Sequence, residues 1–246
     1  MSYITFQPKD YFNNKLYTGD GNATNAITGV GFQPDWVWIK NRGTTARHVI
    51  FDAVRGPQKA LFPHLADAEQ STNQYGTLNS FDSDGFTVAD GSSSGERTNN
   101  SSENYVSWNW KAGGGQGSSN TDGSINTTYT SVNTTAGFSI SQYNGTGSVA
   151  TIGHGLGVKP AFIIIKRIEA NSTWRTYHKS LGATLNVPFE NGAALDQDVI
   201  FNDTEPTTSV FTVGTTTDVN NNGTSHIAYC FAEKKGFSKF GEYEGN

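Results

Sequence analysis

Acid–base or nucleophilic catalysis is the first chemistry to look for in this sequence. His48 and Asp52 stand four residues apart, where a strand would place both side chains on one face, but no serine nucleophile accompanies them. Trp174 and His178 take the corresponding positions in a repeat described below, so the pair is not maintained. The single cysteine, Cys230, lies in a strand-like run and is expected to be a buried, inert thiol. We therefore predict no catalytic residues and no enzymatic activity.

Metal and phosphate sites are not expected either. The histidines and the cysteine show no zinc-ligand spacing. Residues 218–223 match the start of a calcium-binding loop, but Tyr229 takes the twelfth position, where the bidentate glutamate should stand. We interpret this run, and residues 82–85, as turns built from Asn, Asp and Gly. Residues 153–157 are glycine-rich but lack the Lys-Ser/Thr pair of a phosphate-binding loop. No metal and no cofactor is predicted.

Aromatic side chains are the remaining candidates for ligand contacts. Four tryptophans stand in strand-like runs at core spacing, and we expect them to pack in the interior. They are Trp36, Trp38, Trp108 and Trp110. Tyrosines near loops are better placed to stack on sugar rings or to contact a partner. These candidates are Tyr17, Tyr75, Tyr129 and Tyr143.

The composition narrows the class of partner and the type of fold. The net charge is −5 and lysine and arginine do not cluster, which disfavours binding to nucleic acid. No apolar run approaches the about 18 residues of a membrane-spanning helix, so no membrane insertion is expected. Charged residues make up only 16%, and Asn, Thr, Ser and Gly supply most of the polarity. These small polar residues favour turns and strands over helices.

One stretch occurs twice and organises the rest of the chain. Residues 29–40 and 155–166 both contain Gly-x-Gly, a proline three residues later, and a run of bulky residues that ends in lysine. The offset is 155 − 29 = 126 residues, and the same offset relates residues 17–21 to residues 143–147. Self-similarity at a fixed offset indicates a duplicated module.

The duplicated stretch predicts an inner strand in each module. Glycine permits a turn, proline suits the entrance of a strand, and a run that is apolar on both faces is typical of a central strand. We predict equivalent inner strands at residues 36–40 and 161–166, so Trp38→Ala should cost about 3–5 kcal/mol. One short helix is expected, near residues 63–70. Further strands are expected at residues 15–17, 48–51, 86–88, 105–110, 138–143, 174–177, 211–213 and 227–231.

These elements indicate an all-β fold of tandem duplicated β-sandwich modules, jelly-roll-like in each half. We expect a first module at residues 1–113, a Gly/Ser-rich linker at 114–124 and a second module at 125–246. Residues 236–246 echo the start of the second module, so they are expected to form either a capping strand or the beginning of a third repeat. This segment is predicted to pair with a sheet edge, preferably in its own module. Its candidate subunit contacts are Phe237, Phe240 and Tyr243.

The motifs as a set resemble a known family. Residues 17–21, 31–42, 80–86 and 106–113 are similar to repeat β-sandwich domains in virion structural proteins of marine bacteriophages. The similarity extends over nearly the whole chain, including residues 154–166 and 227–245. It implies a tail-fibre or other virion-surface component, and family members often carry the third repeat that this chain only begins.

The resemblance and the absence of a catalytic pattern together give the expected function. We expect a non-enzymatic virion structural protein, displayed on the particle as a tail fibre, appendage or capsid decoration. Its partners would be other virion proteins, as a homo-oligomer or as capsid or tail subunits, together with host-surface glycans. The alternatives are a carbohydrate-binding module and a capsule-depolymerising enzyme, which would need two carboxylates about 5–10 Å apart.

Overall fold

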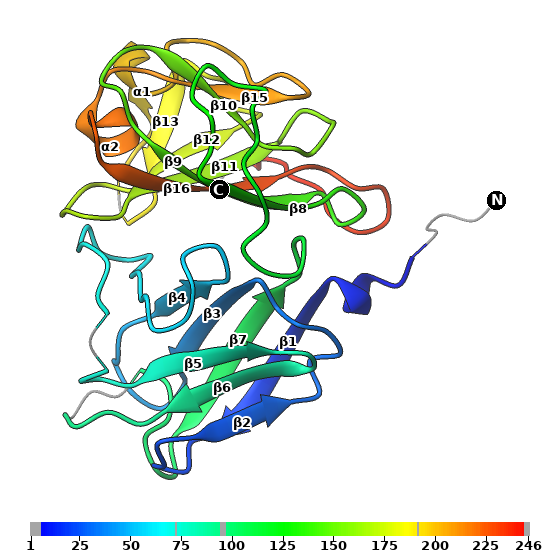
Figure 1. Cartoon of the computed structure of the whole chain (residues 1–246), viewed down its shortest axis with the longest axis vertical. Coiled ribbons are helices and arrows are strands. Elements are labelled where there is room, and N and C mark those ends of the chain that lie inside the picture. Colours follow the sequence, from blue (N-terminus) through cyan, green and yellow to red (C-terminus); the bar gives the residue numbers. More distant parts are fainter. Residues whose placement is uncertain (1–5, 72, 94–96, 191, 244–246) are drawn as a thin grey trace. The chain divides into compact units, whose positions relative to one another are not determined.

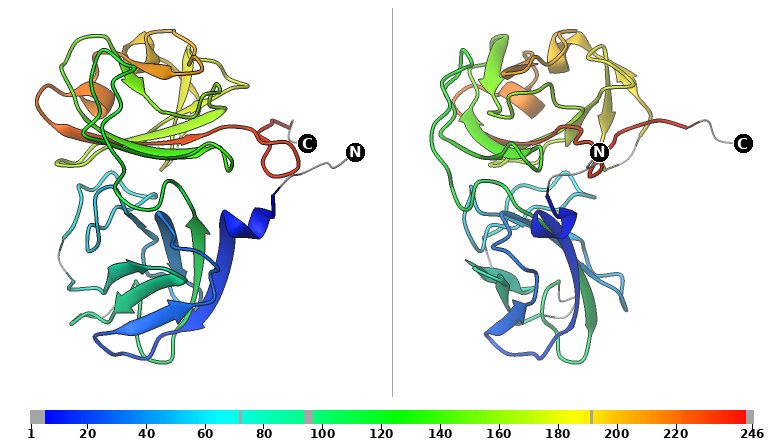
Figure 2. Two further views of the ribbon diagram at one scale, coloured as in Figure 1. Left: turned by 45° about the vertical axis from the view of Figure 1, so that its right-hand side comes forward. Right: turned by 90° about the vertical axis from the view of Figure 1, so that its right-hand side faces the viewer.

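The computed structural model describes residues 6–71, 73–93, 97–190 and 192–243. The chain divides into two compact units, Phe6–Gln116 and Gly117–Asn246, called the first and the second unit below. Both are built from antiparallel strands (Figures 1 and 2). The helices in the described part of the chain are η1 (Pro8–Asp10), α1 (Asp198–Phe201) and α2 (Thr217–Asn220), each of three or four residues. The predicted all-β class is therefore confirmed.

The first unit is a sandwich of two sheets, which Figure 1 shows as two layers. One sheet has the strand order β1-β7-β3-β4 and the other has the order β2-β6-β5. The strands of the larger sheet are β1 (Phe12–Thr18), β7 (Asn104–Trp110), β3 (Trp36–Asn41) and β4 (Val49–Asp52). Those of the smaller sheet are β2 (Asn25–Thr28), β6 (Gly85–Ala89) and β5 (Thr77–Asp82). The core between the sheets is formed by alternate residues of the strands, among them Ile27, Val37, Ile39, Phe51, Phe86 and Tyr105.

The outer face of the larger sheet carries tryptophans that the sequence placed in the core. Trp38 pairs across the strands with Trp108, and both side chains are only half-buried. Ser107 and Asn109 take the opposite, inward-facing positions, where Asn109 Nδ2 donates to Ser107 Oγ at 3.0 Å and to the Asn13 carbonyl at 3.0 Å. These internal hydrogen bonds allow the polar residues to point inward. The expected cost of Trp38→Ala as a core truncation is therefore too large, whereas Trp36, 2% exposed, is buried as predicted.

The second unit contains a seven-stranded sheet and a two-stranded sheet. The large sheet has the order β14-β13-β12-β11-β16-β9-β8, and β10 pairs with β15. Its members are β14 (Leu195–Asp196), β13 (Leu185–Pro188), β12 (Arg175–His178), β11 (Phe162–Arg167), β16 (Ser225–Phe231), β9 (Phe138–Asn144) and β8 (Tyr129–Asn133). The smaller pair is β10 (Ala150–Gly153) and β15 (Val210–Val213). The core of the second unit includes Ile152, Ile163, Ile165, Phe211, Val213 and Cys230. Burial raises the pKa of the Cys230 thiol.

The strands of the two units follow the same order where they correspond. The run β1-β7-β3-β4 has its counterpart in β9-β16-β11-β12, and the pair β2-β6 has its counterpart in β10-β15. β3 and β11 each lie between two other strands, as predicted for residues 36–40 and 161–166. All eight other predicted strands overlap strands of the structure. The second unit differs by adding β13 and β14 beyond β12, and β8 beyond β9.

The helix predicted near residues 63–70 is wrong. This segment is irregular, and Ala60 and Gln70 at its ends exchange backbone hydrogen bonds in an antiparallel bridge. Leu65 N–H donates to the Phe62 carbonyl in a turn, and the Glu69 carboxylate lies 2.8 Å from the guanidinium of Arg55. These tertiary contacts outweigh the weak helical preference of so short a segment.

The segment predicted as a Gly/Ser-rich linker, residues 114–124, contains several hydrogen-bonded residues. The buried carboxylate of Asp35 accepts N–H groups from Ala112 at 2.7 Å, Gly114 at 3.0 Å and Gly115 at 2.6 Å. On the other side, Ser118 pairs with Thr130 by two backbone hydrogen bonds. The boundary between the compact units therefore falls at residues 116 and 117, inside the predicted linker.

The C-terminal segment folds back onto the second unit. The Phe240 ring lies 5.9 Å from that of Phe162 and 6.3 Å from that of Phe231, on the face of the large sheet. Its backbone N–H donates to Glu233 Oε1 at 3.0 Å. Phe237 lies half-buried in the preceding turn, and Tyr243 is 93% exposed. The predicted intramolecular placement holds for Phe240, but the described residues reach a sheet face and not the predicted edge.

Candidate functional site

The first unit contains an open pocket of about 850 Å³ at one end of its sandwich. The pocket lies at the end of the sandwich where β3 ends and β7 begins. These strands are antiparallel, and Asn41, at the end of β3, and Asn100, shortly before β7, both line the pocket. Ligand-binding pockets in proteins typically measure about 300–1,000 Å³. The described lining is almost entirely polar: Asn41, Thr44, Thr45, Ala46, Arg47, Asp67, Gln70, Gln74, Tyr75, Arg97 and Asn100.

One wall of the pocket is the loop between β3 and β4, and Lys40 holds that loop in place. The ammonium group of Lys40 donates to the carbonyls of Asn41 at 2.6 Å, Thr44 at 3.0 Å and Ala46 at 3.0 Å. The Asn41 side chain also accepts N–H groups from Gly43 at 2.9 Å and Thr44 at 3.2 Å. The loop is therefore shaped before any ligand arrives, which lowers the entropic cost of binding.

The opposite wall is built on a stack of one cation and two rings. The guanidinium carbon of Arg97 lies 4.5 Å from the centroid of the Phe62 ring and 4.4 Å from that of Tyr75. Arg97 Nη1 donates to Gln70 Oε1 at 3.2 Å, and the residue is only 5% exposed. Cation–π contacts of this kind are strongest when the cation is removed from water. Arg97 thus fixes the position of Tyr75 in the pocket wall.

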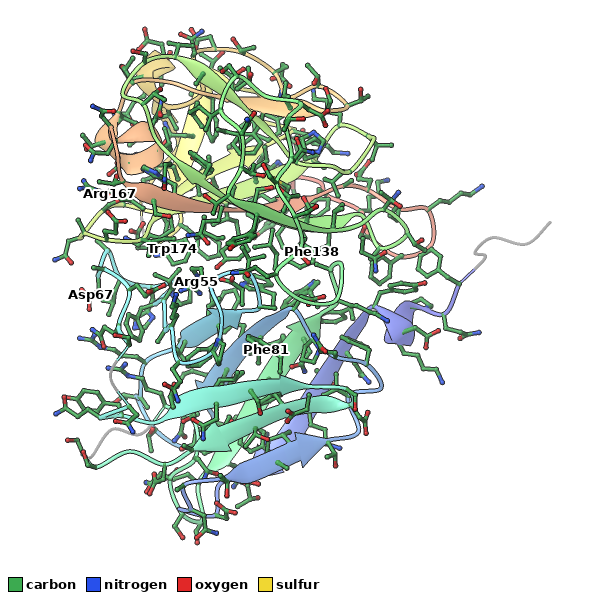
Figure 3. The ribbon with its side chains drawn as sticks, in the orientation of Figure 1. Arg55, Asp67, Phe81, Phe138, Arg167 and Trp174 are labelled. Atoms are coloured by element: carbon green, nitrogen blue, oxygen red, sulfur yellow. The ribbon has the colours of Figure 1, made fainter. Side chains whose placement is uncertain are left out.

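The rim of the pocket carries an exposed ion pair. Arg47 Nη1 lies 2.8 Å from Asp67 Oδ2, and the two side chains are 44% and 34% exposed. Figure 3 shows Asp67 at the margin of the first unit, with Arg55 further in. Gln74 Nε2 donates to Ser93 Oγ at 3.1 Å on the same side of the unit. The pocket therefore offers donors and acceptors together with an aromatic ring, which is a suitable set for a hydroxyl-rich ligand.

The described lining does not provide the groups for acid–base hydrolysis. Asp67 is the one carboxylate among these residues, and it pairs with Arg47. A glycosidase would need two carboxylates facing each other across the bond that is cleaved. The described lining does not contain such a pair of carboxylates.

The His48 and Asp52 side chains do not form a pair. His48 Nδ1 accepts the indole N–H of Trp38 at 3.1 Å, whereas Asp52 is buried against Arg55 at 2.6 Å. Burial lowers the pKa of His48, and the positive charges of Lys40 and of a protonated His64, whose ring lies 5.5 Å away, lower it further. His48 therefore serves as an acceptor for an aromatic side chain on the outer face of the sheet.

The four tyrosines proposed as glycan contacts lie in different places. Tyr75 lines the pocket. Tyr17 stacks on Tyr105 with 5.1 Å between the rings, and its hydroxyl donates to the Thr98 carbonyl at 2.7 Å. Tyr143 is fully buried and donates to the Val219 carbonyl at 2.6 Å, so its ring has no exposed surface.

The fourth candidate, Tyr129, lies half-buried at the start of edge strand β8 in the second unit. Sequence reasoning missed the pocket residues Arg47 and Arg97. Their only sequence signal is that both stand in turn-rich segments that carry little apolar pattern. Nothing in the local sequence shows that these segments meet at one end of the sandwich.

Of the two runs interpreted as turns, residues 82–85 connect β5 to β6 as a turn, whereas residues 218–220 belong to α2, so the turn interpretation is wrong for them. Asp218 pairs with Arg175 at 2.8 Å, and Asn220 donates to the carbonyls of Ser148 at 2.6 Å and Gly214 at 2.8 Å. Asp84 accepts the N–H groups of both glycines in the Gly29-Val30-Gly31 turn. Within the described ranges, no three His, Cys, Asp or Glu side chains come together as metal ligands would. None of the helices described has the length and apolar character needed to cross a membrane.

Comparison with known proteins finds one family. The model of a domain of unknown function, DUF7483, matches residues 7–246. No curated protein and no solved structure matches the chain.

Proposed function

The chain belongs to the DUF7483 family of domains of unknown function. We propose that it is a non-enzymatic virion-surface protein that binds a host-surface saccharide. It would be carried on the particle as a tail fibre, an appendage or a capsid decoration. Its partners would be other virion proteins, as copies of itself or as capsid or tail subunits. The saccharide would occupy the pocket of the first unit.

The observation that carries this proposal is the pre-shaped polar pocket. Its loop wall is held by the Lys40 ammonium and its other wall by the Arg97 stack on Phe62 and Tyr75. Sugars are bound by planar polar side chains that pair with hydroxyl groups and by a ring that covers an apolar sugar face. The pocket combines Tyr75 with amide and guanidinium groups in this way.

We also propose that the two units are tandem duplicated, jelly-roll-like modules. The fixed offset of 126 residues supports this, as does the common order of β1-β7-β3-β4 and β9-β16-β11-β12. The stacked pair Tyr17 and Tyr105 has a counterpart in Tyr143 and His226, with ring separations of 5.1 Å and 5.3 Å and interplanar angles of 13° in both. Repeated display modules of this kind suit a protein that extends from a particle surface.

Binding without cleavage is tested on an array of bacterial and algal polysaccharides and oligosaccharides. The intact chain should bind at least one class of saccharide, and Tyr75→Ala should lose that signal. Product analysis by mass spectrometry should show no shortening of the bound glycan. Shortening that a carboxylate substitution abolishes would establish the depolymerase alternative, and a chain that binds no saccharide would refute the proposal.

Loss of the Lys40 ammonium should weaken saccharide binding, although Lys40 itself does not contact the saccharide. Lys40→Met keeps the length of the side chain but removes its three hydrogen bonds to loop carbonyls. We expect faster amide exchange in residues 42–46 and about a tenfold lower affinity, because the loop must then be ordered by the ligand. Hydrogen exchange and calorimetric titration measure the two effects.

Lys166→Met is the matched control for this experiment. Lys166 takes the corresponding position in β11 of the second unit and donates to the Ser172 carbonyl at 2.6 Å, but it is not among the residues that line the pocket. It should destabilise the second unit and leave the affinity unchanged. Unaltered binding by Lys40→Met would show that the loop does not form the site.

A further inference from the structure

The pocket differs in charge from the chain as a whole. The chain has 17 lysines and arginines against 22 aspartates and glutamates, for a net charge of −5. The described lining of the pocket holds two arginines, Arg47 and Arg97, and one carboxylate, Asp67, which sum to 2 − 1 = +1. Lys40 adds a positive charge directly behind the loop wall. The described lining thus carries a net positive charge on an acidic protein, and a local positive charge favours anions.

Arg97 lines the pocket with a buried guanidinium. The guanidinium contacts the rings of Phe62 and Tyr75, and its Nη1 donates to Gln70 Oε1. Arg97 is 5% exposed, so little side-chain entropy is lost on binding, and screening by water is weak. The planar N–H edge of arginine matches the two oxygens of a carboxylate or of a sulfate.

Arg47 supplies a second guanidinium against the same ring. Its guanidinium carbon lies 5.6 Å from the centroid of Phe62, which Arg97 also contacts. Its partner Asp67 is partly exposed, and exposed ion pairs contribute only about 0–1 kcal/mol. An incoming anion can therefore replace Asp67 at little cost. Both guanidiniums thus line the pocket and contact the same aromatic ring.

From this charge and geometry we infer that the pocket selects an acidic saccharide, one that carries uronate carboxylates or sulfate esters. The inference rests on the proposed function and specifies the ligand class of the same site. The acidic group lies between Arg47 and Arg97, and the sugar ring lies toward Tyr75 and the loop held by Lys40. Neutral sugars lack the charge that these arginines would neutralise.

The test compares saccharides that differ only in charge. Trigalacturonate is titrated against its methyl ester, and a sulfated carrageenan oligosaccharide is titrated against its desulfated form. These two arms distinguish carboxylate from sulfate as the source of the charge. We expect the charged member of at least one pair to bind at least about tenfold more tightly in 50 mM NaCl. The advantage should shrink as the salt concentration rises to 0.5 M, because salt screens exposed charges.

Two variants locate the effect in the pocket. Arg47→Gln should lower the affinity for the charged saccharide about three- to tenfold and that for the neutral form by a smaller factor. Lys159→Gln removes a comparably exposed cation, 46% exposed and paired with Glu205, from the second unit, and should change neither affinity. Circular dichroism confirms that both variants fold.

The outcomes separate this inference from the proposed function. Equal affinities for charged and neutral members of both pairs would overturn the acidic-ligand inference and leave saccharide binding standing. Equal losses in Arg47→Gln and Lys159→Gln would show that net charge, and not the pocket, attracts the saccharide, and would also overturn the inference. A chain that binds no saccharide in any arm would refute the proposed function together with it.

Discussion

Arg55→Met should destabilise the first unit by about 3–5 kcal/mol, because it leaves a buried carboxylate without its counter-ion. Arg55 Nε lies 2.6 Å from Asp52 Oδ2, with the two side chains 1% and 0% exposed. The same guanidinium reaches Glu69 at 2.8 Å and the Lys59 carbonyl at 2.9 Å, so it joins three segments of the unit. Methionine has similar bulk but offers no positive charge and no hydrogen bond.

Denaturant unfolding followed by tryptophan fluorescence measures this loss. Four of the five tryptophans belong to the first unit, so the signal reports mainly on that unit. Arg47→Met is the control, since it breaks an exposed ion pair of the same unit and should cost less than about 1 kcal/mol. Asp52→Asn combined with Arg55→Met should recover much of the stability, because the uncompensated charge is then removed. Equal stabilities of Arg55→Met and the parent would show that the ion pair does not hold the unit together.

Acidification should destabilise the second unit through His226. Burial lowers the pKa of His226 to about 4, and the residue is 0% exposed. Its Nε2 accepts the Asn221 N–H at 3.3 Å, Nδ1 lies 3.1 Å from the Thr224 carbonyl, and the ring stacks on Tyr143. These contacts fit the neutral imidazole with its proton on Nδ1.

The direction of the pH effect follows from the lowered pKa. An unfolded histidine has a pKa of about 6.5, so between pH 6.5 and about 4 the unfolded chain takes up a proton that the folded chain does not. Stability contributed by His226 is complete above pH 6.5 and is lost as the pH falls toward 4. The loss should reach about 2 kcal/mol between pH 7 and pH 5.

His226→Gln removes the titrating group and keeps an acceptor and a donor in its place. Denaturant unfolding of the second unit, followed by hydrogen exchange at pH 7 and pH 5, should then show a smaller pH dependence than the parent. Part of the pH dependence should remain in His226→Gln, because burial also lowers the pKa of His154 in the same unit. An unchanged pH dependence in His226→Gln would contradict the assignment.

The strands were predictable because their signals are local. The Gly-x-Gly turn, the proline and the bulky run of residues 36–40 specify β3 without reference to the rest of the chain, and the copy at residues 161–166 specifies β11. Trp108 and Trp110 are two residues apart and lie on one face of β7, as strand geometry requires. The sequence did not predict which face of β7 turns inward. Ser107 and Asn109 face inward because of their hydrogen bonds to each other and to Asn13, which no local pattern indicates.

The pocket was not predictable, apart from Tyr75, because its residues come from separate loops. Arg47 follows β3, whereas Arg97 precedes β7, and only strand pairing brings both to one end of the sandwich. The cation–π stack that places Tyr75 joins Phe62 to Arg97, 35 residues later in sequence (97 − 62 = 35). A single sequence carries no periodic pattern for such contacts. The predicted helix near residues 63–70 failed for the same reason, since the Ala60–Gln70 bridge is a tertiary contact.

The position of this chain in a virus particle is the most direct test of the proposed function. Virus particles produced from a genome that encodes the chain can be purified and imaged by cryo-electron microscopy. We expect both units on the outside of the particle, with the pocket lined by Arg47, Tyr75 and Arg97 open to solvent. A chain that is absent from the particles, or whose pocket is closed by a neighbouring subunit, would contradict it.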